Sequence, residues 1–395
     1  MRGLARTAVE RLDLAFTLGR ILGLAPVLVM SHRIGVGDPD LSGATERYQV
    51  ALFLSTLVLY GAPQTYLVKL GIERKVAVHH LAISAGALAT VILVLDLFDL
   101  AEGLLAPFVF VVIFRSYYLL FATIWRDDPR SSLLLLMSAI LSLIVYAVTL
   151  NYWAAGAVSL LSLVIASGRG DISLRYLRVA VRRYAWILTR NASYFVAFLL
   201  QQTFGQVLLF AYAFLVSGDP YVVATQIVYL YTLAFVGHGM VFRYYLSRLR
   251  RERREVDPRR VVLRNMLLSI LLGTVSAGCL VVLRVPMGEV LFGSSAITRS
   301  DALLVGALVI INSINFGWNA LFLSIRRPQI LIAVSMVSTA VTLALLVVLE
   351  RSEFGSAVIL SMSVGLTLQA ILRAVVGVRL LRQSPKVLPS VTLPG

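Results

Sequence analysis

Long apolar runs separated by short polar stretches are the dominant pattern along this chain. Several runs approach or exceed the roughly 18 apolar residues that indicate a membrane-spanning helix. We therefore predict an all-α integral membrane protein with about twelve transmembrane helices, at residues 13–31, 48–68, 77–95, 103–125, 131–149, 151–168, 186–216, 221–243, 262–283, 302–324, 328–349 and 355–381. Only Leu150 separates the fifth and sixth segments, which form either a tight helical hairpin or one miscounted segment.

The basic residues indicate which side of the membrane each connection faces. If every predicted segment crosses once, most of the 36 lysine and arginine residues lie on the side that holds both termini. The opposite side holds Arg33, Arg47, Arg284, Arg299 and Arg351. Because short cytoplasmic loops are enriched in lysine and arginine, we expect both termini to be cytoplasmic and the protein to lie in the cytoplasmic (inner) cell membrane.

A basic segment between the sixth and seventh spans divides the chain into two halves. Its arginines share one helical face, at positions Arg175, Arg178 and Arg182. This pattern predicts an amphipathic linker helix over 169–185, with the arginines near anionic lipids at the cytoplasmic surface. The predicted domains are an N-terminal six-helix bundle, 1–168, and a C-terminal six-helix bundle with a cytoplasmic tail, 186–395.

The two halves share a short stretch of sequence. Gly37-Asp38-Pro39 follows the first span and Gly218-Asp219-Pro220 follows the seventh, so each tripeptide opens the connection to the next span. Many transporters are built from such internal repeats, with the substrate site between them. Glycine, aspartate and proline are also ordinary turn residues, so coincidence stays an alternative.

The composition excludes several classes of protein. Apolar residues make up 59% of the chain and charged residues 14%, which leaves too little polar surface for a soluble enzyme, a DNA-binding protein or a disordered chain. The net charge of +16 reflects membrane topology, and we expect no nucleic-acid partner. One cysteine and four histidines without metal-ligand spacing indicate no metal centre, and we expect no cofactor.

One arginine lies near the middle of a predicted span. Arg115 stands in VVIFRSYYLLF, and an ionised side chain at this depth costs roughly 2.5 kcal/mol or more unless it faces a partner or a cavity. We expect it to bind an anion in a water-filled cavity, with Tyr118 on the same helical face for contact with a polar substrate. The alternative is an arginine that backbone carbonyls satisfy, or one that local thinning of the bilayer brings to an interface. Arg20 is a second candidate, although its side chain is long enough to reach the cytoplasmic interface.

Amide side chains form polar stripes at helical spacing in two other spans. The stripes consist of Asn312, Asn315 and Asn319, and of Gln202 and Gln206. Each stripe either hydrogen-bonds a polar substrate or joins neighbouring helices, as polar residues often do in membranes.

Two further groups of polar residues lie closer to the predicted cytoplasmic ends of their spans. Gln369 and Arg373 share a face one turn apart, but Arg373 is long enough to reach the interface. His238 and Arg243 are interpreted as interfacial residues.

Three stretches together suggest a family. They are LVLYGAPQTYLVKLG, VLLFAYAFLVSGDPYVVATQIVYLYTLAF and EVLFGSSAITRSDALLVGALVIINSINFGWNALFLSIRRPQILI. In these features the chain resembles the multidrug/oligosaccharidyl-lipid/polysaccharide (MOP) exporter superfamily, and within it the Wzx-type polysaccharide and O-antigen flippases. The resemblance implies two six-helix halves of the MOP or MATE type, which flip a polyprenyl-diphosphate-linked oligosaccharide by alternating access. It also implies that Arg20 lies in the central cavity, because the first helix of these flippases commonly carries a basic residue there.

The same resemblance implies several partners. They are a lipid-linked glycan substrate, a coupling ion (H⁺ or Na⁺), and the polysaccharide polymerase and glycosyltransferases of the same process.

A drug exporter of the superfamily is the first alternative function. Exchange of a cationic drug needs a buried carboxylate, however, and the acidic residues here lie at or near span ends. A membrane glycosyltransferase or polymerase that uses Asp38 and Asp40 is the second, although we interpret this pair as a turn. A non-transporting scaffold, which would not require a buried Arg115, is the third. We predict a transporter and not an enzyme.

Overall fold

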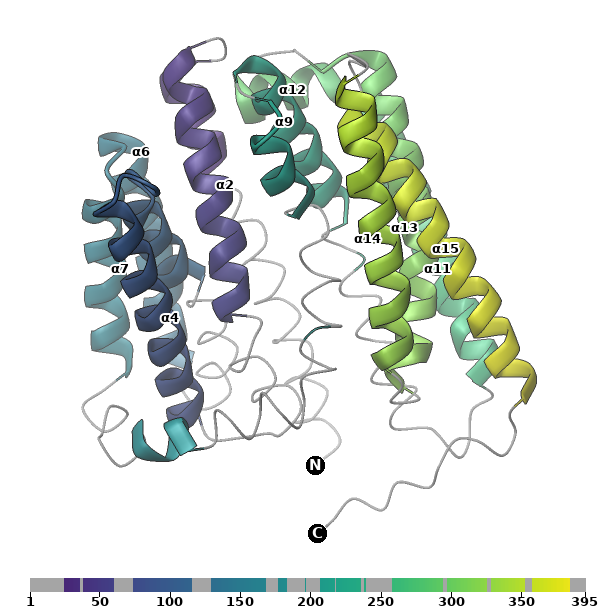
Figure 1. The fold of residues 1–395 in the computed structure, drawn as a ribbon, viewed down its shortest axis with the longest axis horizontal. Coiled ribbons are helices and arrows are strands. Elements are labelled where there is room, and N and C mark those ends of the chain that lie inside the picture. Colours follow the sequence, from purple (N-terminus) through teal and green to yellow (C-terminus); the bar gives the residue numbers. More distant parts are fainter. Residues whose placement is uncertain are drawn as a thin grey trace. The chain divides into compact units, whose positions relative to one another are not determined.

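All regular secondary structure in the described part of the chain is helical, which confirms the predicted all-α class. The computed structural model describes residues 25–35, 38–59, 74–115, 129–167, 177–182, 196, 207–216, 218–235, 238, 258–293, 297–324, 328–351 and 357–383. The labelled helices in Figure 1 are α2 (Pro39–Leu59), α4 (Arg74–Asp96), α6 (Pro129–Thr149), α7 (Tyr152–Ser167), α9 (Asp219–Ala234), α11 (Pro258–Val282), α12 (Arg284–Phe292), α13 (Arg299–Ser324), α14 (Pro328–Arg351) and α15 (Ala357–Gln383). Residues 25–34, 105–115 and 207–213 are also helical.

The chain forms two compact units. Unit 1 comprises Met1–Tyr229 and Val285–Ile297, and unit 2 comprises Leu230–Arg284 and Thr298–Gly395. Residues 177–182 form a helical turn in which both arginines are exposed. The division into two six-helix bundles with a linker helix over 169–185 stays a prediction.

In unit 1, α6 and α7 form the tight helical hairpin that was one of the two expectations for these segments. Leu150 adopts a left-handed conformation with φ of 51°, which reverses the chain directly after α6. The side chain of Asn151 then caps α7, because its Oδ1 accepts the backbone amides of Trp153 at 2.9 Å and Ala154 at 3.2 Å. Deeper in the hairpin, the hydroxyl of Ser159 donates to that of Ser142 at 2.7 Å.

The helix α2 begins well before its apolar run. The run predicts a span over 48–68, whereas α2 already begins at Pro39. Asp38 caps this helix, since its Oδ1 accepts the backbone amide of Asp40 at 2.9 Å, and proline suits the first helical turn. Three polar side chains of its first half are buried inside unit 1, namely Ser42, Thr45 and Gln49. Hydropathy alone therefore places the start of this helix too late.

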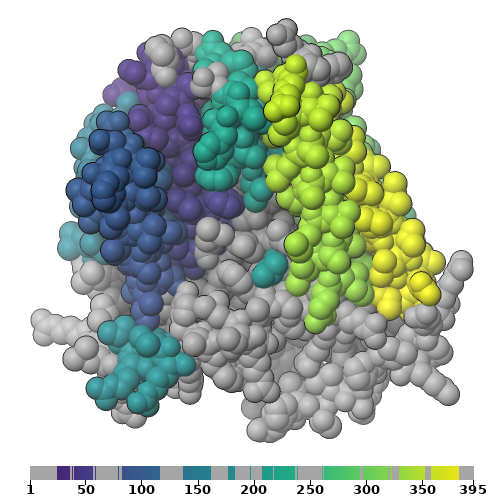
Figure 2. Space-filling model, viewed as in Figure 1, coloured from purple at the N-terminus to yellow at the C-terminus, as the bar shows by residue number. Residues whose placement is uncertain are grey.

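Unit 2 is built around four long helices. Helix α13 packs on α11 and on α15, and α15 packs in turn on α14 (Figure 1). Close approach is possible at Gly377 of α15, because a β-carbon there would collide with the ring of Trp318 on α13. Figure 2 shows α14 and α15 side by side at the surface of this unit.

The outward surfaces of the helices are apolar, as a lipid-facing surface requires. In the described residues, four helical segments are long and apolar enough to cross a membrane, at Val262–Val282, Arg299–Trp318, Gln329–Arg351 and Ala357–Leu381. Large apolar side chains are exposed along them, among others Leu267, Leu271, Val275, Ile371 and Val375. Since such a surface is stable only in lipid, the protein is a multi-pass membrane protein.

The short helix α12 lies where the sequence predicts only a connection between two spans. It belongs to unit 1, although the chain on either side of it belongs to unit 2. The ring of His32 holds it, with Nε2 2.6 Å from the carbonyl oxygen of Val290. This contact joins residues far apart in sequence, and no local sequence pattern predicts it.

Candidate functional site

Arg115 is buried inside unit 1 and rests on helix α2. Its side chain is 8% exposed. Its Nη1 donates to the hydroxyls of Thr56 at 2.7 Å and Ser55 at 3.0 Å, and to the carbonyl oxygen of Leu52 at 3.2 Å. Both hydroxyls donate their own protons to the same Leu52 carbonyl, at 2.7 and 2.8 Å, so their lone pairs face the guanidinium. The serine and threonine of α2 thus fix the position of this cation.

An aromatic stack holds the helical segment that carries Arg115. Phe110 stacks on Tyr146 of α6 with ring centroids 5.5 Å apart, and Tyr146 stacks on Tyr152 of α7 at 4.8 Å. The Tyr152 hydroxyl donates to the sulfur of Met30 at 3.3 Å. These rigid rings tie Arg115's segment to the α6–α7 hairpin and limit its movement.

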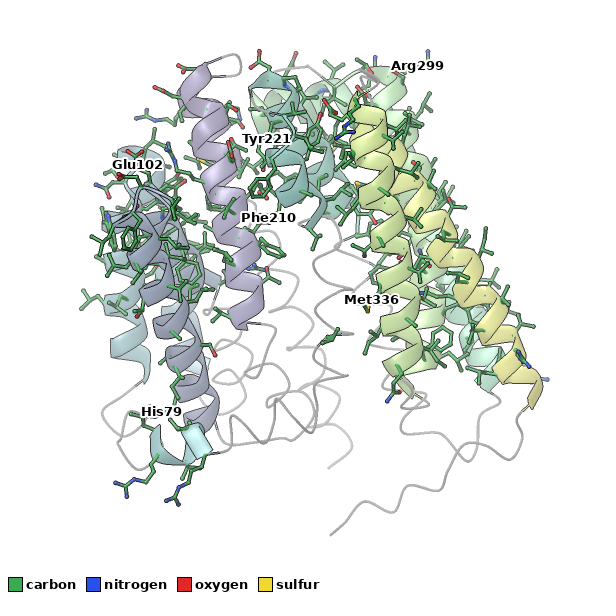
Figure 3. The ribbon with its side chains drawn as sticks, in the orientation of Figure 1. His79, Glu102, Phe210, Tyr221, Arg299 and Met336 are labelled. Atoms are coloured by element: carbon green, nitrogen blue, oxygen red, sulfur yellow. The ribbon has the colours of Figure 1, made fainter. Side chains whose placement is uncertain are left out.

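A second group of buried polar residues lies on α2 and α9 in unit 1, and hydrogen bonds at two levels join these segments. The backbone amide of Gly218 donates to the Ser42 hydroxyl at 2.8 Å, and Nε2 of Gln49 donates to the Tyr229 hydroxyl further along. Figure 3 shows Tyr221, near the start of α9, beside α2. We define the α2–α9 face as Ser42, Thr45, Gln49, Gln226 and Tyr229, all of which are buried.

Several polar atoms of the α2–α9 face have no hydrogen-bond partner in the part of the chain that the structure describes. They are the Thr45 hydroxyl, Oε1 of Gln49, and both the oxygen and the nitrogen of the Gln226 amide. Gln226 is only 1% exposed. Each such atom costs about 1–3 kcal/mol if it stays unpaired. A polar ligand or water that pairs them removes this cost.

The asparagine stripe of α13 joins helices of unit 2. The amide nitrogen of Asn312 donates to the Tyr231 hydroxyl at 2.5 Å, and that of Asn315 donates to the Leu366 carbonyl oxygen on α15 at 3.2 Å. Both contacts match the helix-joining alternative for this stripe, while substrate binding by these residues stays a prediction. Asn319 lies on α13, but its side chain is outside the described part, as are Arg20, Tyr118, Gln202 and Gln206.

Two residues expected near the interface are instead buried in unit 2. Arg373 is 2% exposed, because α14 packs over the face of α15 that carries it, so the expectation that it reaches the interface is wrong. His238 is fully buried between α11 and α13, with Nε2 3.0 Å from the Ser269 carbonyl oxygen and 2.9 Å from the Ser313 hydroxyl. Sequence analysis missed both burials, since only their distance from the span ends was available as a signal.

The acidic residues do not form a site in the described part of the chain. Asp38 is committed to capping α2, which agrees with the interpretation of the Asp38-Pro39-Asp40 segment as a turn. Every described carboxylate lies in a connection or within about two turns of a helix end. In the described residues, no three histidine, cysteine or acidic side chains are grouped to hold a metal ion.

The fold is similar to that of known transporters. A multidrug resistance MATE family transporter of the MOP superfamily, in an inward-facing conformation, aligns with a TM-score of 0.65 over 95% of this chain and 98% of its own, at 14% identity. The lipid II flippase MurJ, in an inward closed conformation, aligns with a TM-score of 0.61 over 92% of this chain and 87% of its own, also at 14% identity. The eukaryotic MATE transporter AtDTX14 aligns at 0.57, over 98% and 100%, with 14% identity.

At the level of sequence the chain stands apart from known families. No family model and no curated protein matches it. The structural similarities therefore establish the fold, which is the all-helical fold shared by MATE transporters and MurJ.

Proposed function

We propose that the chain is a membrane transporter that flips a polyprenyl-diphosphate-linked oligosaccharide from the inner to the outer leaflet by alternating access. The fold supports transport, because similar structures include MATE transporters and a flippase of lipid II. The proposed reaction moves the substrate and changes no covalent bond. The protein therefore needs groups that replace water around the sugar and around the diphosphate.

The α2–α9 face carries this proposal. A sugar presents many hydroxyl groups, and each can both donate and accept a hydrogen bond. The unpaired oxygen and nitrogen of the Gln226 amide, together with Oε1 of Gln49 and the Thr45 hydroxyl, offer both kinds of partner from buried positions on α9 and α2. A purely apolar cargo would leave these groups unpaired, so the face favours a polar cargo.

Arg115 is the proposed partner of the diphosphate. Guanidinium groups bind phosphate oxygens through paired N–H donors, and a low-dielectric interior strengthens the interaction. The hydroxyls of Ser55 and Thr56 hold its Nη1 side without adding negative charge. In alternating access the substrate reaches this cation when the helices around it rearrange.

Multidrug export is the second candidate, favoured by the similarity to a multidrug MATE transporter. A transporter of cationic drugs uses a buried carboxylate to bind its cargo or its coupling ion. In the described part of the chain, the carboxylates lie near helix ends or in connections. This distribution favours an anionic lipid-linked cargo over a cationic drug.

A flipping assay tests the proposal. Full-length protein is reconstituted in liposomes with a fluorescent short-chain polyprenyl-diphosphate oligosaccharide, and an impermeant quencher reports how much probe stays in the inner leaflet. We expect protein-dependent flipping, reduced about tenfold by Gln226→Leu. Gln329→Leu, the same change at an exposed glutamine of α14, is the matched control and should flip normally. Export of a cationic drug without any flipping of the probe would contradict the proposal and favour the second candidate.

A further inference from the structure

A stripe of polar residues lies between α14 and α15 in unit 2. On α14, Ser335 and Ser338 are fully buried, while the neighbouring Met336 and Val337 are exposed, so the two serines face inward (Figure 3). On α15, Gln369 and Arg373 are buried and lie one turn apart. These four side chains belong to two helices that pack directly on each other.

The buried side chains of the two helices lie within hydrogen-bonding distance of each other. Nε2 of Gln369 lies 3.3 Å from the Ser338 hydroxyl and 3.4 Å from the Ser335 hydroxyl. Nη2 of Arg373 lies 3.4 Å from the same Ser335 hydroxyl. All three distances are at the long end for a hydrogen bond, so the donors are only weakly satisfied.

The positive charge of Arg373 is not balanced within the described chain. Its Nε is buried and has no acceptor there. The described carboxylate on these two helices is Glu350, near the far end of α14 from Ser335. Removing one partner of a buried ion pair is costly because an uncompensated charge remains in a low-dielectric interior. A negatively charged partner would stabilise a buried arginine in this state.

The chemistry around Arg373 is that of a donor-rich site. Arginine and the amide nitrogen of Gln369 are donors, and the Ser335 hydroxyl accepts from both, which leaves its own proton directed elsewhere. A second buried donor, Nε1 of Trp318, has no acceptor among the described residues and belongs to the ring that packs on Gly377, one turn after Arg373. The described side-chain groups next to Arg373 are therefore mainly donors.

We propose that Arg373, Gln369 and Ser335 form a binding site for a small monovalent anion of halide size, such as chloride. A halide accepts several hydrogen bonds without a required geometry, which suits donors from two helices. The site consists of residues of unit 2, whereas the α2–α9 face belongs to unit 1, so the inference goes beyond the proposed cargo site.

The bound anion would stabilise the folded protein in proportion to its occupancy. Full-length protein is purified in detergent with sodium gluconate, and chloride or bromide then replaces gluconate at constant ionic strength. We expect the melting temperature to rise by a few degrees and to saturate. Arg373→Met should abolish this halide dependence, and Gln369→Met should raise the half-saturating concentration about tenfold. Arg379→Met, at an exposed arginine of α15, is the matched control and should keep the wild-type response.

A further arm identifies the anion class. Inorganic phosphate should give no saturating stabilisation, whereas an equal response to phosphate would overturn the halide-sized site in favour of a phosphate or headgroup site. An equal halide response in wild type and Arg373→Met, or none in wild type, would also overturn it. If Arg373→Met does not fold, Ser335→Ala replaces it, and an unchanged half-saturating concentration there contradicts the proposal. Because no transport is measured, these outcomes are independent of the flipping assay.

Discussion

Ser42 and Gly218 join the first turns of α2 and α9. The Gly218 amide donates to the Ser42 hydroxyl at 2.8 Å, and that hydroxyl lies 3.4 Å from the Gly218 carbonyl oxygen. Each helix begins within one of the two Gly-Asp-Pro tripeptides that the halves share. The repeated tripeptides therefore mark corresponding helix starts that lie in contact. The internal repeat stays a prediction, because a contact between two helix starts is equally compatible with a coincidence of turn residues.

Gly218→Ala should destabilise the protein by about 1 kcal/mol. Gly218 has a φ of 81°, in the left-handed region that disfavours a side chain, while no atom stands within 4 Å of an added β-carbon. The cost is therefore conformational strain alone. Gly86→Ala is the control, because Gly86 is also uncrowded but lies inside α4 with an ordinary φ. Thermal unfolding measures both, and equal melting temperatures for the two variants would contradict the strain argument.

Much of the fold was predictable because a membrane imposes length and apolarity on each span. The α6–α7 hairpin and the helices of unit 2 follow their apolar runs closely. The start of α2 was not predictable in this way, because its first half buries serine, threonine and glutamine inside unit 1 and so lacks the apolar signal. Helix α12 was missed for another reason, since its described hydrogen-bond partner His32 is far away in the sequence.

The site was less predictable than the fold. The position of Arg115 near the middle of a predicted span singled it out as a candidate. The structure adds the hydroxyls of Ser55 and Thr56 on α2 as its partners, and no spacing in the sequence connects them to Arg115. The position of Arg373 near the end of its predicted span also suggested that its side chain reaches the interface, but α14 packs over α15 and buries it. Gln226 carried no signal beyond being a polar residue, next to Thr225, in an apolar run. Side-chain partners depend on which helices pack together, and a hydropathy pattern does not contain that information.

Gly273→Ala should disturb the buried contacts of His238. An added β-carbon at Gly273 would collide with the Ser313 hydroxyl, which lies 2.9 Å from His238 Nε2. We expect a loss of about 1–3 kcal/mol in unfolding free energy, the usual range for overpacking. Gly278→Ala on the same helix meets no atom within 4 Å and should be neutral or slightly stabilising. If both variants unfold alike in a denaturant titration, the His238 contact is not tightly packed.

The topology predicted from the basic residues is tested by cysteine labelling. Asp40, Asp219 and Arg182 are exposed, so each accepts a single cysteine in a background in which the native Cys279 is replaced by serine. An impermeant thiol reagent applied to intact cells should label positions 40 and 219 and spare position 182. Labelling after permeabilisation is the control for accessibility. Labelling of position 182 in intact cells would invert the predicted arrangement.

Asp38→Asn with Asp40→Asn should leave transport nearly unchanged. Asparagine caps helices about as well as aspartate, so α2 keeps its start without either carboxylate. A glycosyltransferase that used this pair would lose all activity. The flipping assay, normalised to protein in the membrane, distinguishes these outcomes. Asp38→Ala is the contrasting variant and should lower stability by about 1 kcal/mol through loss of the cap.

The Arg115 series tests the proposed diphosphate partner. Arg115→Lys should keep part of the flipping activity, because the charge remains while the paired N–H donors that match phosphate are lost. Arg115→Gln should reduce flipping to background, and Arg115→Glu should be at least as damaging because it repels the diphosphate. Arg264→Gln, at an exposed arginine of α11, removes the same charge elsewhere and is the matched control.

Substitutions of the two residues that hydrogen-bond Arg115 distinguish a role of Arg115 in substrate binding from a role in stability. Ser55→Ala and Thr56→Val remove hydroxyls that hold its Nη1 but leave the charge in place. We expect them to lower the melting temperature and to reduce flipping less than Arg115→Gln does. The decisive comparison is Arg115→Gln against Arg115→Lys at equal abundance in the membrane. If glutamine transports as well as arginine, the buried guanidinium serves packing between α2 and its own helix and does not bind the substrate's phosphates.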